Sequence, residues 1–468
     1  MGRNAELDLH GMLAGRSGLS GVQHVLTGRS SRSMLRRDLG ELLSETVLGP
    51  LRLLRAKYKP GRYLTASFSA TISSLNNGKL NTRPVDIAWR VEGPESCKHP
   101  AQGYQEMQAD AALRGLAAPF RRLIADLPSC EACAQVYPLD ARFPQLVRLA
   151  DPDYVLEMLS GAPEVHCGRK LPAFYRITPV RYRPGQRHVL RYDPDGEEGQ
   201  GRAVFAKLFY DPGRAVGIYR SAVRANEWLT ARKEKILSIR PLAILSDEGS
   251  ILYPEVTGKS FSRYLRGPAV KVREYLALAG SILRALNDMP VEFAEDLEPK
   301  TLSDEARLIR RASEHIRVLS PELHSKIQEI VELGETLYWR MPQEMAAFTH
   351  SDYKADHLWV TPAGLTLIDF DSCSQSDPAS DAGKFLADLR WWYTLYGKPG
   401  VEEAQHDFME SYSPGLPEGR LQRSRIYEAL ILTKIAIRRV PLFDRHWHAR
   451  TGQLLALAEA VLREVERG

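Results

Sequence analysis

The chain has 468 residues, of which 44% are hydrophobic and 26% are charged, and its formal net charge at pH 7 is +5. This composition is ordinary for a globular protein of two or three domains, and so small a charge on so long a chain argues against a nucleic-acid partner. The sequence contains no run of about 18 apolar residues, so no membrane span is predicted. The five cysteines argue against a disulfide framework and favour a reducing, cytoplasmic compartment.

Residues 1–39 are predicted to form a leader outside the globular domains. The segment from Leu9 to Arg37 is rich in Ser, Gly and Arg and contains no acidic residue. Transit peptides share this composition, but a disordered or loosely packed leader is the favoured interpretation.

A degenerate repeat follows, in which residues 57–61 (KYKPG) match residues 181–185 (RYRPG). In each copy a strand-like run follows the Pro-Gly turn, and a later strand and a helical stretch come next. These paired segments are Tyr63–Phe68 and His188–Tyr192, Val85–Trp89 and Val204–Lys207, and Gln102–Leu116 and Arg214–Arg232. Each copy is therefore predicted to form a small antiparallel sheet with one helix, and residues 163–172 are predicted to link the copies. The third strand carries Trp89 in the first copy where the second copy has Lys207.

Two short cysteine-containing motifs follow the helical stretch of the first copy. Cys130 and Cys133 form a Cys-x-x-Cys pair, and His166 precedes Cys167. Two such pairs can supply the four ligands of a structural zinc ion. The irregular second pair makes loop and core thiols the favoured interpretation.

The pattern changes to helices after Gly258. Apolar residues recur at helical spacing in Pro268–Leu286, Leu302–Leu319 and Ser320–Trp339, and helices are predicted to resume from Pro378, Val401, Leu421 and Gly452. A predicted hairpin interrupts this region, with strands Leu358–Val360 and Leu365–Ile368 joined by a Thr-Pro-Ala-Gly turn. Such a hairpin brings Asp352 and Asp369 to the same end of one unit.

Three motifs surround this hairpin: His350-Ser351-Asp352, Ile368-Asp369-Phe370, and the sequence SDPASD at residues 376–381. In this order and spacing they resemble motifs of the aminoglycoside phosphotransferase and choline kinase family, which are small-molecule kinases related to protein kinases. The catalytic loop of that family reads His-Gly-Asp-x-x-x-x-Asn, its metal motif reads Ile-Asp-Phe or Ile-Asp-Trp, and a Gly-Asp-Pro-x-x-Asp segment follows.

The resemblance covers about residues 172–468 and implies an α+β, two-lobed protein-kinase-like fold. Residues 172–257 would form the small antiparallel sheet lobe, and residues 258–468 the helical lobe that carries the catalytic hairpin. The first copy of the repeat, residues 40–165, would then be a degenerate, non-catalytic domain resembling the sheet lobe.

The resemblance also implies roles for the residues around the hairpin. Asp352 would be the catalytic base and Asp369 a Mg²⁺ ligand. His357 stands where the family has Asn, and its imidazole nitrogen suits Mn²⁺ better than Mg²⁺. Four alternatives follow for His357. It would bind the metal less strongly than Asn does, or position a phosphate instead. Otherwise Asp356 would compensate for the lost Asn, or catalysis would be impaired. His350 is expected to hold the loop in place.

Other residues would bind the nucleotide. Lys207 would contact the α- and β-phosphates and pair with Glu227 in the following helix. Arg183 and Arg187 flank a turn that would lie over the phosphates. The segment between the lobes would hold adenine through residues Tyr253, Glu255 and Val256. In the helix after the hairpin, Asp381 is expected either to support the catalytic loop or to lie near the substrate.

These features predict an ATP-dependent kinase that uses Mg²⁺, or Mn²⁺, to move the γ-phosphate to an alcohol group of a small molecule. The acceptor is predicted to be a sugar, an aminoglycoside or an amino-alcohol-like metabolite, with no nucleic-acid or membrane partner. The sequence leaves the acceptor and the oligomeric state open. A pseudokinase that binds nucleotide as a scaffold, and an enzyme that transfers AMP, are the alternatives.

Overall fold

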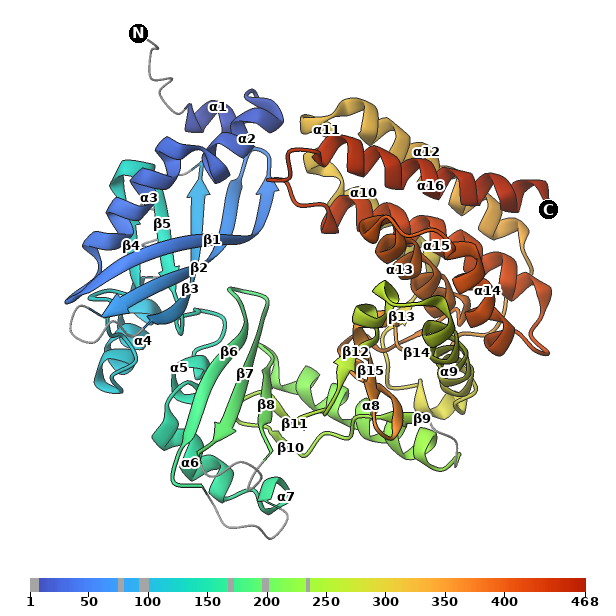
Figure 1. Cartoon of the computed structure of the whole chain (residues 1–468), viewed down its shortest axis with the longest axis horizontal. Coiled ribbons are helices and arrows are strands. Elements are labelled where there is room, and N and C mark those ends of the chain that lie inside the picture. Colours follow the sequence, from blue (N-terminus) through green and yellow to red (C-terminus); the bar gives the residue numbers. More distant parts are fainter. Residues whose placement is uncertain (1–7, 75–79, 92–100, 167–171, 196–201, 233–235) are drawn as a thin grey trace. The chain divides into compact units, whose positions relative to one another are not determined.

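The computed structural model of the chain describes residues 8–74, 80–91, 101–166, 172–195, 202–232 and 236–468. Two compact units are present (Figure 1). Unit 1 contains Met1–Pro212, Leu242–Tyr253 and Pro441–Trp447, and unit 2 contains Gly213–Pro241, Pro254–Val440 and His448–Gly468. None of the described helices is long and apolar enough to cross a membrane.

Unit 1 begins with three helices where the composition suggested a disordered leader. They are α1 (Leu9–Leu13), α2 (Gly18–Thr27) and α3 (Arg29–Glu41). Val25, Leu26, Leu35 and Leu39 are all buried. These apolar residues recur at helical spacing, so each helix has one face to pack, and this outweighs the high Ser, Gly and Arg content.

The first copy of the repeat forms a five-stranded sheet in the order β1-β2-β3-β5-β4. Its elements are β1 (Thr46–Lys59), β2 (Tyr63–Ser74), β3 (Leu80–Arg90), α4 (Ala101–Leu113), β4 (Ile124–Leu127) and β5 (Ala132–Val136). In β2 the side chains alternate, with Leu64, Ala66 and Phe68 buried and the intervening residues only partly covered. One face of the sheet is therefore core and the other is polar.

The second copy forms a sheet in the order β10-β11-β8-β7-β6, which is the same arrangement of successive strands. Its strands are β6 (Tyr175–Arg183), β7 (Arg187–Pro194), β8 (Val204–Leu208), β10 (Ala243–Leu245) and β11 (Ser250–Pro254), and helix α8 (Pro212–Thr230) follows β8. The turn glycines Gly61 and Gly185 both have positive φ, 71° and 68°. The predicted internal repeat is thus matched by strand order, by the position of the helix and by turn geometry.

The strand register changes one detail of the predicted match. Lys207 is paired with Val189, four residues after Gly185. The equivalent residue of the first copy, four after Gly61, is paired with Ala88 and not with Trp89. Because side chains alternate along a strand, this shift of one residue moves the matching position from the buried face to the polar face.

The segment before the second sheet is predicted to belong to the first domain, but it packs against the second sheet. Helices α5 (Gln145–Leu149), α6 (Pro152–Ser160) and α7 (Pro163–His166) precede β6. Leu146 and Leu149 share a core with Leu190 and Ala206 of the second sheet. The predicted linker therefore begins inside α7, and its residues 167–171 lie outside the described part of the chain.

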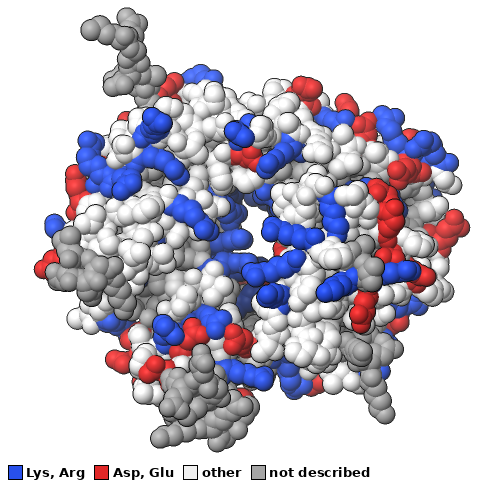
Figure 2. All heavy atoms as spheres, in the orientation of Figure 1, with Lys and Arg blue, Asp and Glu red and all other residues white. Residues whose placement is uncertain are grey.

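Unit 2 is mainly helical, as the sequence predicts. Its further helices are α9 (Ala269–Asn287), α10 (Leu302–Ala312), α11 (Glu314–Leu319), α12 (Pro321–Arg340), α13 (Ala379–Tyr396), α14 (Val401–Tyr412), α15 (Glu418–Arg439) and α16 (Trp447–Arg467). The single helix predicted over 302–319 breaks at Ser313, which caps both α10 and α11. Figure 2 shows basic and acidic side chains interspersed on the drawn face of this unit.

Two small sheets complete unit 2. One contains β12 (Lys259–Ser260), β15 (Leu358–Thr361), β16 (Gly364–Leu367) and β9 (Ile236–Ser238), and the other contains β13 (Pro299–Lys300), β17 (Ser374–Ser376) and β14 (Ala347–Thr349). Strands β15 and β16 form the predicted antiparallel hairpin, with Leu358 opposite Leu367 and Thr361 opposite Gly364.

Helices α13 and α15 approach closely at Gly383. A Cβ atom at this position would lie 2.4 Å from Tyr427 Cβ and 2.5 Å from the Ser424 carbonyl oxygen. We therefore expect Gly383→Ala to lower the free energy of unfolding by about 1–3 kcal/mol, as overpacking does. Gly217→Ala in α8 is the matched control, because no atom lies within 4 Å of its added Cβ. It should be neutral or stabilising by about 0.5–1 kcal/mol. Urea denaturation of both variants measures the difference, and equal effects would show that the two helices are not in close contact.

Candidate active site

The hairpin of β15 and β16 brings three potential metal ligands together in unit 2. Asp352 lies on the loop after β14, His357 ends a 3₁₀ helix at Ala355–His357, and Asp369 follows β16. Each contributes one ligand atom, and these atoms all lie within 4.8 Å of one another. The predicted convergence of Asp352 and Asp369 is therefore present.

Two lysines hold the Asp352 carboxylate. Lys354 Nζ lies 2.6 Å from Oδ2, and Lys384 Nζ from α13 lies 3.2 Å from Oδ1. Burial raises the pKa of Asp352, but the charges of Lys384, His357 and Lys354 outweigh burial and hold the pKa well below its ordinary value. The carboxylate is ionised and fixed in direction, with both oxygens engaged.

Helix α13 supports the loop that carries Asp352. Asp381 accepts hydrogen bonds from the backbone N–H groups of His350 (2.7 Å) and Ser351 (2.8 Å). Ser351 has a φ of 58°, a left-handed conformation that these bonds help to hold. Burial raises the pKa of Asp381 to about 7, and the two backbone bonds act in the opposite direction. Of the two roles considered for Asp381, the structure therefore places it in support of the loop.

Two further contacts fix the loop. Asp388 Oδ2 accepts a hydrogen bond from the Ala355 N–H (3.0 Å), and its other oxygen pairs with Arg439 at 2.7 Å. The His350 ring donates from Nε2 to the Ile368 carbonyl (3.0 Å), which ties the loop to the segment before Asp369. Burial lowers the pKa of His350, so the ring is a neutral bridge, as its expected structural role requires.

His357 lies between the two carboxylates. Its Nε2 is 3.1 Å from Asp369 Oδ2, and its Nδ1 is 3.7 Å from Asp352 Oδ2. Nδ1 is buried and has no hydrogen-bond partner within the described residues. Burial lowers the pKa of His357 to about 3, which the neighbouring Asp369 only partly offsets. The ring is therefore neutral and keeps a lone pair available.

These residues fit a divalent cation. The two carboxylates and a neutral imidazole form a mixed oxygen and nitrogen donor set, and the buried ring nitrogen without a partner gains one if an ion is bound. Mg²⁺ prefers oxygen ligands, whereas imidazole suits Mn²⁺ and other transition metals better. Asp369, like Ser351, has a left-handed backbone conformation, with a φ of 70°.

The residues predicted to bind the nucleotide lie on both units. Lys207 is buried on β8 of unit 1, where Arg183 and Arg187 flank the β6–β7 turn. Tyr253 lies at the end of β11, and Glu255 and Val256 follow it in unit 2. Their roles toward a nucleotide stay predictions.

The predicted partner of Lys207 has another neighbour within unit 2. Glu227 on α8 forms an ion pair with Arg240, with Arg240 Nη1 3.0 Å from Oε1, and both side chains are largely exposed. An exposed pair of this kind contributes little to stability, so it leaves Glu227 able to exchange partners. The Lys207–Glu227 pair also stays a prediction.

Sequence reasoning did not single out Lys354, Lys384 or the loop contact of Asp388. The position of Lys384 one turn after Asp381 in a predicted helix was a usable signal, because residues three apart share a helix face. Lys354 was two residues from the expected base. No local pattern marks Asp388 as a partner of the Ala355 N–H.

The cysteine pair lies in the interior of unit 1. Cys130 and Cys133 are both buried, and neither forms a disulfide bond within the described residues. Burial raises the pKa of Cys130 to about 12, and the nearby Asp38 acts in the same direction, so without a bound metal its sulfur is a protonated thiol. Cys167 lies outside the described residues. Among the residues that are described, the Asp352, His357 and Asp369 group is the one cluster of three or more such ligands.

Comparison with known proteins identifies a family for this part of the chain. The model of the APH phosphotransferase enzyme family matches residues 196–457. No curated protein matches the chain. Solved structures similar to the chain include an aminoglycoside phosphotransferase in complex with GDP and kanamycin, at 13% identity over 67% of this chain and 99% of that one, with a TM-score of 0.44. Another is choline kinase from Cryptosporidium parvum Iowa II, at 12% identity over 66% and 96%, with a TM-score of 0.46. A third is a choline/ethanolamine kinase family protein from Mesorhizobium loti, at 14% identity over 67% and 99%, with a TM-score of 0.45.

Proposed function

The chain belongs to the APH phosphotransferase enzyme family, and from this premise we propose that it is an ATP-dependent small-molecule kinase. It would transfer the γ-phosphate of ATP to an alcohol group. The observation that carries this proposal is the convergence of Asp352, His357 and Asp369 within 4.8 Å. Phosphoryl transfer needs one carboxylate to orient the acceptor and another to hold a metal on the phosphates.

Asp352 is proposed as the catalytic base. Because its pKa is low, it is a weak base toward a free hydroxyl. Its contribution is to accept a hydrogen bond from the acceptor hydroxyl, to orient that oxygen, and to take the proton late in the transfer. Lys354 and Lys384 limit the directions in which its oxygens can point, which keeps the acceptor in one position.

Asp369 and His357 are proposed to hold the divalent cation. A bound Mg²⁺ or Mn²⁺ would supply positive charge that stabilises the transferred phosphoryl group. The chain keeps the imidazole neutral by burying it, so His357 can act as a ligand at neutral pH. Lys207, Arg183 and Arg187 are proposed to hold the phosphates, and the segment 253–256 to hold adenine.

The proposed acceptors are sugars, aminoglycosides and amino alcohols, because the catalytic-loop motif resembles that of the kinases acting on such compounds. ADP release measured against a panel of these compounds tests the proposal. Stimulation of ADP release by one class, with a phosphorylated product, supports a kinase. An adenylated product in place of ADP would identify transfer of AMP.

A scaffold that binds nucleotide without turnover is the second candidate, because His357 stands in place of the family's Asn. Residual ATP hydrolysis separates the two functions. A kinase should lose most of its residual hydrolysis in Asp352→Asn. Equal residual rates in the wild type and this variant would favour the scaffold.

His357→Asn tests the metal site directly. We expect the wild type to use Mn²⁺ better than Mg²⁺, and the variant to shift the Mn²⁺ to Mg²⁺ activity ratio toward Mg²⁺ by about 10-fold or more, because the nitrogen ligand is replaced by an amide oxygen. Metal titrations of ATP turnover measure this ratio. His406→Asn, an exposed histidine on α14, is the control and should leave the ratio unchanged. Identical titrations for His357→Asn and the wild type would remove His357 from the metal site.

A further inference from the structure

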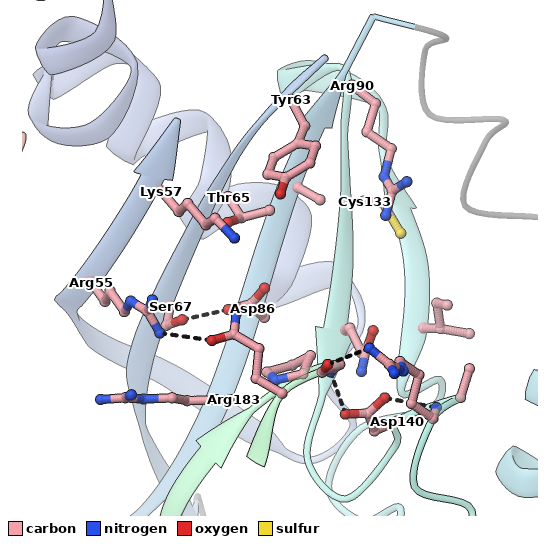
Figure 3. A pocket seen from close by; sticks show the side chains of 18 of the residues that line it. Arg55, Lys57, Tyr63, Thr65, Ser67, Asp86, Arg90, Cys133, Asp140 and Arg183 are labelled. Carbon is pink, nitrogen blue, oxygen red and sulfur yellow. Dashed lines mark hydrogen bonds between the residues drawn. The ribbon is translucent and has the colours of Figure 1, made fainter. Parts of the chain in front are cut away.

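A separate cavity of about 320 Å³ lies in unit 1, on the polar face of the first sheet (Figure 3). The floor of the cavity consists of side chains from residues that are paired across neighbouring strands. One row of paired residues runs from Arg55 on β1 through Ser67 and Asp86 to Gln135 on β5. The next row runs through Lys57, Thr65, Ala88 and Cys133. Strand register alone therefore places alternating polar side chains from four strands on one surface.

Three segments from outside the sheet enclose this surface. Tyr104 from α4, the loop at Asp140–Arg142 and the β6–β7 turn at residues 183–186 all line the cavity. The turn is tied to the loop, because Asp140 Oδ2 accepts a hydrogen bond from the Gly185 N–H (2.6 Å) and Arg142 Nη1 donates to the Gly185 carbonyl (3.0 Å). The polar face is therefore walled in, whereas the polar face of a sheet is commonly left to solvent.

Enclosing this face has an electrostatic cost. Burial raises the pKa of Asp86 to about 6, and the hydrogen bond from the Ser67 hydroxyl only partly offsets this. Burial also lowers the pKa of Arg183 to about 10, and the charges of Arg181, Arg55 and Arg187 lower it further. Both groups stand in an environment that opposes their charges. Such sites within a concave pocket are typical of ligand binding.

The charge of the lining has one predominant sign. Five basic side chains, Arg55, Lys57, Arg90, Arg142 and Arg183, line the cavity against two acidic ones, Asp86 and Asp140. Asp140 is already engaged, because its Oδ2 lies 2.7 Å from His188 Nε2 and also accepts the Gly185 N–H. Asp86 is at the floor, and the basic side chains stand around it. The rim therefore attracts an anion, and the floor offers hydroxyl, amide and carboxyl groups.

The internal repeat points to the same surface. In the second sheet Lys207 lies on the face opposite the core residues Ala206 and Leu208. Its counterpart by register is Ala88, which lines the cavity. The first sheet thus keeps an open pocket on the matching face, with a small residue in place of the lysine and with basic side chains supplied by neighbouring strands.

We propose that this cavity binds a small phosphorylated compound that also carries hydroxyl groups, of the sugar phosphate class. The phosphate would lie among the arginines, whose planar groups match phosphate oxygens in pairs. The hydroxyl groups would face Thr65, Ser67, Asp86 and Gln135. Asp86 on the floor repels an anionic group there, so the ligand has one orientation, with its phosphate toward the basic rim.

Isothermal titration of the full chain tests this proposal. The probes are ribose 5-phosphate, glucose 6-phosphate and glycerol 3-phosphate, with ribose and inorganic phosphate as comparisons. At least one organic phosphate should bind more tightly than either comparison. Absence of binding by all three organic phosphates would overturn the proposal, and so would inorganic phosphate binding as tightly as they do.

Variants assign the binding to this cavity. Lys57→Gln/Arg90→Gln removes two exposed rim charges and should weaken binding about 10-fold or more, because hydrogen bonds to charged groups contribute more than neutral ones do. Ala88→Leu fills the floor without changing the charge and should also weaken binding. Arg52→Gln is the matched control. Arg52 is an exposed basic residue on β1, the strand of Lys57, but it does not line the cavity, so this variant should bind as the wild type does. Circular dichroism checks that each variant is folded.

Asp352→Asn separates this cavity from the proposed kinase site. The variant should keep full affinity for the organic phosphate even where phosphotransfer is lost. Binding that is lost in Asp352→Asn and retained in both cavity variants would place the ligand at the kinase site and overturn the inference. Failure of the kinase assay alone would leave the titration results unchanged, so the two proposals fail separately.

Discussion

Asp352→Asn is expected to lower kcat for phosphotransfer by about 10²–10⁴-fold, the range found when a positioned general base is removed. The amide has the same shape as the carboxylate, but it cannot take the acceptor proton. It also removes the negative charge that Lys354 and Lys384 contact at 2.6 Å and 3.2 Å. KM for ATP should change little, because the proposed nucleotide contacts lie elsewhere.

Steady-state kinetics with ATP and an acceptor that the wild-type protein phosphorylates measure this effect. Asp356→Asn is the matched control, because Asp356 lies in the adjacent 3₁₀ helix but outside the three-residue cluster. It should retain near wild-type kcat. If both variants lost activity equally, the loop as a whole and not the Asp352 carboxylate would be responsible.

Asp369→Asn should have the second-largest effect, a fall in kcat/KM of at least about 10²-fold, comparable with loss of one preorganised group that stabilises the transition state. The variant removes one of two carboxylates proposed to face the cation and leaves His357 Nε2 beside a neutral amide. Affinity for ATP should also lose its dependence on Mg²⁺ or Mn²⁺. Titration of ATP with and without metal measures that dependence.

Asp371→Asn is the comparison for this prediction. Asp371 is a buried carboxylate two residues further along the chain and is outside the cluster. Its variant should keep metal-dependent ATP binding. An Asp369→Asn protein in which metal still strengthens ATP binding as it does in the wild type would exclude Asp369 as a ligand.

Much of the site was predictable because its signal is local. Two short apolar runs around a Thr-Pro-Ala-Gly turn indicate a hairpin, and a hairpin brings the residues just outside its two strands together. This is why Asp352 and Asp369 converge as expected. Long helices such as α9 and α12 were also predicted closely, because their apolar residues recur with a clear period.

The parts that were missed depend on distant segments. Lys384 reaches Asp352 only because α13 packs beside the loop, and Asp388 reaches the Ala355 N–H for the same reason. The match of Ala88 with Lys207 depends on strand register, where an error of one residue exchanges the two faces of the sheet. Composition misled over the described part of the predicted leader, residues 8–39, because a few buried apolar side chains outweigh many polar ones.

The cavity in unit 1 is the clearest case of a feature that sequence reasoning cannot supply. Its floor comes from four strands, and its wall includes a turn from the second sheet. No motif links these segments along the chain. Only the strand pairing shows that Arg55, Asp86 and Gln135 belong to one surface.

Mass spectrometry of an accepted small molecule, incubated with ATP and Mn²⁺ or Mg²⁺, tests the central proposal most directly. The proposed kinase predicts that wild-type protein adds one phosphoryl group to the acceptor and releases ADP, and that Asp352→Asn and Asp369→Asn add almost none. An acceptor that gains AMP, or product formed equally by the wild type and both variants, would contradict the assignment of these two carboxylates to phosphoryl transfer.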